Sequence, residues 1–217
     1  MDTIARLGGI MVTAFVAGLS GALMPGPLLA VTLDESARRG ARAGPLLILG
    51  HMILEGALVA GLAFGLAAVL AHRVVIGSIG VVGGVVMGWM GVGMLRSVGT
   101  LSLDAASAAP SRLHPVAAGI VVSLSNPYWT LWWVTIGAGY VVMGLRFGLP
   151  GILAFFAGHI LADFAWYSLV SLSVARGRRF LTNRVYRGLV GVCGAALVLF
   201  GAWFVWSGAC TLGWGQQ

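Results

Sequence analysis

Two histidine–carboxylate pairs with the same spacing lie inside apolar segments of the chain. His51 is followed four residues later by Glu55, His159 is followed four residues later by Asp163, and a glycine precedes each histidine. Residues four positions apart share one face of a helix. Charged side chains at the centre of a membrane helix cost about 2.5–3.5 kcal/mol each, so they are rare there and mark ion or substrate pathways. We expect one proton-exchanging or substrate-binding cluster; polar contacts that hold helices together are the alternative.

The same four side chains are a plausible ligand set for a divalent metal ion, because such ions accept imidazole and carboxylate ligands. Other chemical signatures are missing from the sequence. It contains no GxxxxGK[ST] phosphate loop, no CxxC pair and no HExxH motif, which argues against an ATP motor, a thiol relay and a zinc protease. We therefore expect neither a cofactor nor enzymatic activity.

Prolines interrupt two of the apolar segments. The first carries Pro25, Gly26 and Pro27, and the second carries Asn126 and Pro127. Proline removes a backbone donor and clashes with the preceding helical turn. In lipid, a broken helix is tolerated where its backbone faces protein or a water-filled cavity. Paired breaks of this kind indicate the binding site of a transporter, so we include these five residues in the predicted site.

An aromatic cluster follows the second break, with Tyr128, Trp129, Trp132 and Trp133 in close succession. These rings could line a cavity and contact a cationic substrate through their faces, or they could serve packing alone. Tyr128 and Trp129, next to the break, are included in the predicted site.

Composition identifies an integral membrane protein. Of 217 residues, 59% are hydrophobic and 9% are charged, and a soluble fold could not cover so much apolar surface. The net charge of +7 comes from 13 arginines clustered between the apolar runs. That pattern indicates membrane topology rather than a nucleic-acid partner, so the expected environment is a lipid bilayer.

Six apolar segments approach or exceed the roughly 20 residues that a membrane helix needs. The expected fold is therefore an all-α polytopic membrane protein with six transmembrane helices. The expected spans are residues 8–33, 44–70, 74–95, 115–142, 149–174 and 187–207.

The spans divide into two matching halves. Residues 1–95 and 115–217 would each supply three helices, with residues 96–114 as a cytoplasmic linker. The proline breaks fall in the first and fourth spans, and the histidine–carboxylate pairs fall in the second and fifth. Because three is an odd number, the second half must cross the membrane in the opposite sense. This predicts a 3+3 inverted repeat with broken first and fourth helices.

Arginine counts predict the orientation. The loops between spans 1 and 2, 3 and 4, and 5 and 6 carry ten arginines, against three on the other side. The positive-inside rule places the arginine-rich loops in the cytoplasm and both termini outside. Asp34 and Glu35 begin the first of these loops, where we expect solvated side chains, with a place for Glu35 in an inner vestibule as the alternative.

The stretch PGPLLAVTLDESARRGARAG, which begins at Pro25, resembles the first-span signature of the lysine-exporter (LysE/RhtB) superfamily. The resemblance extends over nearly the whole chain, including SNPYWTLWW and the final glycine-rich span. It implies a six-span inner-membrane exporter of amino acids or similar small molecules, powered by an ion gradient and often dimeric. His51 and His159 depart from the commonest pattern of amino-acid exporters, and related clades handle metal ions. The positions that match the superfamily are Pro25, Gly26, Pro27, Glu55, Asn126 and Pro127.

These observations together predict a secondary active exporter of an amino acid or related small metabolite. Glu55 and Asp163 would bind and release the proton that drives transport, with another ion as the alternative driving ion. His51 and His159 would adjust the proton affinity of the two carboxylates. The alternative is a divalent metal-ion exporter that uses the same four residues as ligands. A non-transporting scaffold or electron relay is the third hypothesis.

Overall fold

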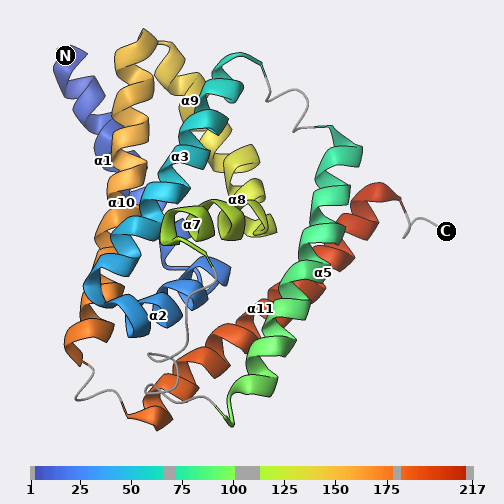
Figure 1. Ribbon diagram of the computed structural model, residues 1–217. Helices are drawn as coiled ribbons and strands as arrows, with labels where there is room; N and C mark the ends of the chain where they lie inside the picture. Colours follow the sequence, from blue (N-terminus) through green and yellow to red (C-terminus); the bar gives the residue numbers. More distant parts are fainter. Residues whose placement is uncertain (1–2, 66–71, 101–112, 178–181, 214–217) are drawn as a thin grey trace.

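The computed structural model describes residues 3–65, 72–100, 113–177 and 182–213, and within these ranges the regular structure is helical throughout. The all-α prediction is confirmed (Figure 1). A 3-10 turn covers Gly40–Arg42 and a π-helical segment covers Trp133–Gly137. The α-helices are α1 (Thr3–Ala22), α2 (Pro27–Arg39), α3 (Ala43–Ala63), α5 (Arg73–Ser97), α7 (Pro115–Leu124), α8 (Pro127–Trp132), α9 (Ala138–Leu145), α10 (Gly148–Gly177) and α11 (Asn183–Leu212).

The chain is a multi-pass membrane protein. Five helical segments in its described part are long and apolar enough to cross a bilayer, namely α1, α2 continued into α3, α5, α10 and α11. The expected fourth span, residues 115–142, is divided among α7, α8, the π-helical segment and α9. Large apolar side chains such as Trp89 and Leu199 stand exposed on the outer surface, as a lipid environment requires.

The proline motifs interrupt the helices where the sequence predicts. α1 ends at Ala22, and Pro27 is the first residue of α2. α7 ends at Leu124, and Pro127 is the first residue of α8. Proline suits the first position of a helix, because its missing N–H would have no helical partner there.

The prediction of a loop from residue 34 to residue 42 is wrong, because α2 continues to Arg39. Two ion pairs, each between residues four positions apart, stabilise this helix. Arg38 Nε lies 3.0 Å from Asp34 Oδ2, and Arg39 Nε lies 2.7 Å from Glu35 Oε2. The prediction that Glu35 is solvated is also wrong: α2 packs against α10 and α3, and Glu35 is 6% exposed.

Glycines allow two helix pairs to approach closely, α1 with α10 and α3 with α7. A Cβ atom at Gly158 of α10 would collide with the carbonyl of Met11 in α1. A Cβ atom at Gly50 of α3 would collide with the carbonyl of Val116 in α7. Each of these glycines precedes a histidine, so the closest backbone contacts fix the position of both imidazoles.

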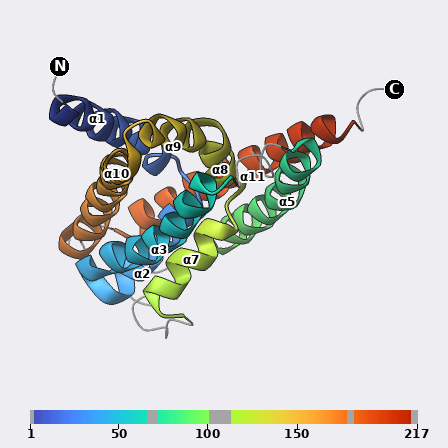
Figure 2. The same cartoon turned by 90° about the horizontal axis from the view of Figure 1, so that it is seen from above.

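The helices α5 and α11 form an antiparallel pair that lies beside the other helices (Figure 2). Small residues line their contact, because a Cβ atom at Gly84 would come within 2.6 Å of the Gly201 carbonyl. Glycine stripes of this kind let membrane helices pack at short range. One face of this pair closes the central cavity described below.

Candidate functional site

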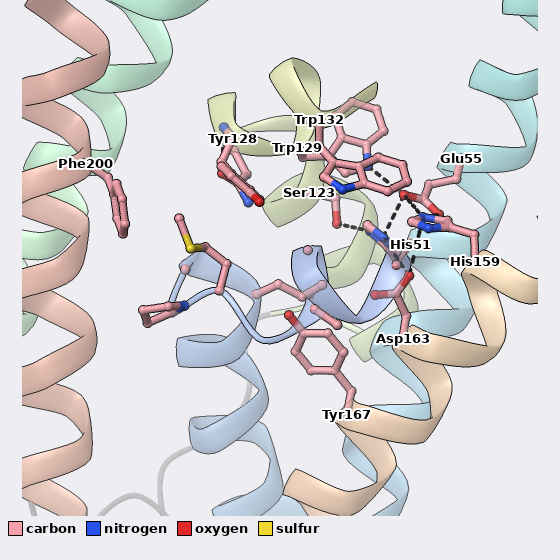
Figure 3. A pocket seen from close by; sticks show the side chains of 18 of the residues that line it. His51, Glu55, Ser123, Tyr128, Trp129, Trp132, His159, Asp163, Tyr167 and Phe200 are labelled. Carbon is pink, nitrogen blue, oxygen red and sulfur yellow. Dashed lines mark hydrogen bonds and ion pairs between the residues drawn. The ribbon is translucent and has the colours of Figure 1, made fainter. Parts of the chain in front are cut away.

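The four ionisable residues predicted from the sequence meet in one buried cluster (Figure 3). His51 and Glu55 project from α3, and His159 and Asp163 project from α10. Each is at most 5% exposed. Each residue offers one nitrogen or oxygen atom that could bind a metal ion, and these four atoms lie within 4.8 Å of one another.

Each imidazole reaches both carboxylates through its Nε2 atom. His51 Nε2 lies 2.9 Å from Glu55 Oε1 and 3.7 Å from Asp163 Oδ2. His159 Nε2 lies 3.1 Å from Glu55 Oε2 and 3.6 Å from Asp163 Oδ2. Each imidazole therefore lies between the two acids, within hydrogen-bond distance of Glu55 and within ion-pair distance of Asp163.

The two acids differ in how firmly they are held. Glu55 Oε1 accepts the indole N–H groups of Trp129 and Trp133, at 2.9 and 2.8 Å. An indole nitrogen only donates hydrogen bonds, so both contacts fix Glu55 as an acceptor. In the described part of the chain, Glu55 Oε2 and Asp163 Oδ2 are both buried without a hydrogen bond, so the two indole donors on Glu55 Oε1 are what distinguishes the acids. Asp163 is therefore the acid that is freer to bind a proton or a cationic group.

The two imidazoles are oriented by different contacts. His51 Nδ1 lies 2.6 Å from the hydroxyl of Ser123 in α7. His159 is stacked on Trp132, with ring centroids 4.5 Å apart and an angle of 26° between the planes. Its Nδ1 atom faces α1 at Gly18, where a Cβ atom would come within 3.0 Å.

The cluster forms one wall of a cavity that reaches both helix interruptions. The centres of water molecules can occupy about 50 Å³ of this cavity. One water needs about 10–15 Å³ by the same measure, so the cavity has room for several waters or a small ligand. Gly26 is the N-cap of α2 and Asn126 is the N-cap of α8. A Cβ atom at Gly26 would lie 3.8 Å from Asn126 Nδ2, so the two interruptions are neighbours.

The structure brings most of the predicted site residues to this cavity. Pro27 begins α2 and Pro127 begins α8, directly after the interruptions. Those that line the cavity are Pro25, Gly26, His51, Glu55, Asn126, Tyr128, Trp129, His159 and Asp163.

Other residues of the site were missed by the sequence reasoning or assigned to packing. Trp133 was weighed as a packing residue, yet it donates to Glu55. Ser123 is a small polar residue one turn before Asn126, a signal that could have been used. Met87 and Phe200 also line the cavity, but in apolar helices nothing in their sequence context marks them.

Comparison with known proteins identifies the family of the chain. Residues 19–208 match the family described as LysE type translocator, and the match spans most of the chain. The chain therefore belongs to the LysE type translocators, which are transporters and not enzymes. The resemblance seen around Pro25 is thereby confirmed.

Two curated relatives match over nearly their whole lengths. The chain is 26% identical over 201 residues to the "Putative amino acid efflux protein YcgF" of Bacillus subtilis (strain 168), covering 92% of this chain and 96% of that protein. It is 27% identical over 192 residues to the "Chemotactic transduction protein ChpE" of Pseudomonas aeruginosa PAO1, covering 87% of this chain and 94% of that protein. No solved structure matches the chain significantly.

Proposed function

We propose that the protein is a secondary active exporter of amino acids or related small metabolites, coupled to the movement of protons across the cell membrane. The observation that carries this proposal is the meeting of four buried ionisable side chains in a cavity between two helix interruptions. The relative named for amino-acid efflux supports the same substrate class.

Asp163 is the proposed site of exchange between proton and substrate. It lines the cavity, and in the described residues its Oδ2 has no hydrogen-bond donor of its own. An ionised Asp163 attracts a substrate ammonium group, whereas a protonated Asp163 has no charge to do so. The proton and the amine therefore compete for one group, which is the requirement for antiport. Glu55, fixed by two indoles, would receive the proton through the imidazoles.

The substrate carboxylate would bind at the helix interruptions. The N-cap of α2, Gly26, has no side-chain cap, and helix N-termini attract anions through their free N–H groups. Two side-chain donors lie nearby: the Asn126 amide, and the indole nitrogen of Trp132, which is buried without an acceptor in the described ranges. A zwitterion could therefore span the cavity from this region to Asp163.

We further propose that residues 1–95 and 115–217 are two inverted repeats of three spans, giving six spans with both termini outside. Most of the linker proposed for residues 96–114 lies outside the described residues. The paired glycine contacts support the repeat, because α1 meets α10 at Gly158 as α7 meets α3 at Gly50. Because α2 and α8 would be equivalent helices of the two repeats, the same motion in each would open the cavity first to one side of the membrane and then to the other.

Transport by the purified protein in liposomes tests the proposal. With an acidic interior, outward proton flow should drive uptake of a radiolabelled amino acid. Glu55→Gln combined with Asp163→Asn should abolish the gradient-driven uptake. Asp34→Asn is the matched control, because Asp34 is a carboxylate on α2 whose side chain is 41% exposed. Gradient-driven uptake that survives in the double variant would refute the proton role.

A divalent metal ion is the second candidate substrate, and the geometry of the cluster favours it. Bonds of about 2.0–2.1 Å in a tetrahedral site place neighbouring ligand atoms about 3.4 Å apart. The four contacts between histidine nitrogens and carboxylate oxygens span 2.9–3.7 Å. All four ligand atoms lie within 4.8 Å of one another, so small movements of the side chains would complete a tetrahedral site. Zn²⁺ uptake measured with an internal dye, for wild type and His159→Gln, separates the candidates. Amino-acid uptake without zinc uptake would exclude the metal.

A further inference from the structure

The cavity has two chemically different ends. The ionisable cluster lies at the end formed by α3 and α10. The opposite end is lined by Met87 of α5, Tyr128 of α8 and Phe200 of α11, which pack in one apolar cluster. Figure 3 shows Phe200 across the cavity from Glu55 and His159, with Tyr128 between them. This second end consists of thioether and aromatic groups.

Charge is distributed unevenly along the lining. Among the described residues that form the cavity, the carboxylates are Glu55 and Asp163, and arginine is absent. Met87 is 1% exposed, and both Tyr128 and Phe200 pack against its apolar cluster. A second charge placed at this end would lose its hydration without gaining an opposite charge, and contact with the ring faces would offset only part of this cost for a cation.

The same end favours an apolar group of the substrate. Thioether side chains adapt their shape to irregular neighbours and make favourable contacts with aromatic rings. Each buried methylene group strengthens binding by about fourfold. A substrate whose amine lies at Asp163 would direct its side chain away from the charged cluster and toward these groups.

We propose that the cavity selects α-amino acids with an uncharged, apolar side chain, and that Met87, Tyr128 and Phe200 form the side-chain subsite. This inference rests on the proposed function, because it takes the cavity to be the amino-acid site. Amino acids with a charged side chain, such as lysine and glutamate, are the substrates that the subsite rejects.

Competition in the same liposomes tests the selection without any substitution. Unlabelled amino acids compete with radiolabelled leucine for uptake into liposomes that carry the unmodified protein. Along the series alanine, 2-aminobutyrate and norvaline, the inhibition constant should fall by about fourfold for each added methylene. Lysine and glutamate should compete at least about tenfold more weakly than leucine. Lysine that competes as well as leucine would overturn the inference.

A substitution locates the subsite. Phe200→Ala should raise the inhibition constant of leucine by about tenfold while that of alanine changes little, because only the longer side chain reaches the lost ring. Leu199→Ala is the control, since Leu199 is the adjacent residue of α11 and is 71% exposed. Equal changes for leucine and alanine would place the subsite elsewhere.

The outcomes separate the inference from the proposed function. If amino acids compete without regard to side-chain polarity and uptake still requires Asp163, the subsite is wrong and the exporter proposal stands. If none of the amino acids is transported or competes, both fail together.

Discussion

Trp133 donates its indole N–H to Oε1 of Glu55 at 2.8 Å. The donor belongs to the π-helical segment that follows α8, and the acceptor belongs to α3. Short π-helical stretches are rare and occur frequently at functional sites. Here the π-helical segment connects α8 directly to the ionisable cluster, so movement of α8 would change the surroundings of Glu55.

Trp133→Phe should impair both stability and transport, because a smaller aromatic ring replaces the buried indole and one donor to a buried carboxylate is lost. A buried acceptor without its partner costs about 1–3 kcal/mol, and more where it is charged. Thermal unfolding in detergent and gradient-driven uptake provide the measurements. The matched control is Trp166→Phe on α10, because the Trp166 indole nitrogen has no hydrogen-bond partner in the described part of the chain. Equal effects of the two substitutions would contradict the role of the donor.

Ser123→Ala should destabilise the protein by about 1–3 kcal/mol, because His51 Nδ1 would lose its partner at 2.6 Å. Transport should also fall, since the imidazole would no longer be held toward Glu55. Ser125→Ala serves as the control, as its hydroxyl bonds the carbonyl of Val121 within its own helical turn. Chemical unfolding of both variants in detergent measures the difference, and unfolding curves that coincide would argue against the bond.

Gly50→Ala and Gly158→Ala should each lower the yield of folded protein. The added methyl group would collide with a carbonyl of the neighbouring helix, and overpacking of this kind costs about 1–3 kcal/mol. The control is Gly93→Ala in α5, where a Cβ atom meets nothing within 4 Å. Size-exclusion profiles and melting temperatures compare the three variants. Normal melting of both site variants would show that these helix contacts can relax.

A reversible cross-link between α2 and α10 should stop transport if α2 moves during the cycle. Ser36 Oγ lies 2.9 Å from Ser171 Oγ, and both serines are buried. Cysteines at these two positions, introduced after Cys193 and Cys210 are replaced, should form a disulfide under oxidation. Uptake should then cease and should return after reduction. The corresponding single-cysteine variants control for oxidation, and full uptake by the cross-linked protein would show that α2 stays with α10.

The sequence allowed prediction of the helical class and the central cluster because both depend on strong local signals. His51 and Glu55 lie in an apolar run, where ionisable groups are costly and therefore rare unless they have a function. The continuation of α2 through Glu35 was not predicted, because a polar stretch after an apolar one usually leaves the membrane. Glu35 instead pairs with Arg39 and is buried on α2, which packs against α10 and α3, a tertiary effect that spacing along the chain does not reveal.

The role of each aromatic residue in the site was harder to predict. Trp129 and Trp133 lie four residues apart, and both reach Glu55. Trp132, between them, stacks on His159 instead. Which tryptophan donates and which stacks depends on the rotation of a helix that changes from α to π geometry within this stretch. Periodicity assumes a constant rotation per residue, so it could not separate these roles.

The division of the proposed fourth crossing into short helices has a consequence for how the polypeptide enters the bilayer. α7 has 10 residues and is therefore about 15 Å long, roughly half of the hydrocarbon thickness. The free backbone groups at its end would be unsatisfied in lipid until α3 and α8 surround them. This crossing should therefore become stable during biogenesis only after earlier helices are in place, and the N-terminal half would serve as its insertion partner.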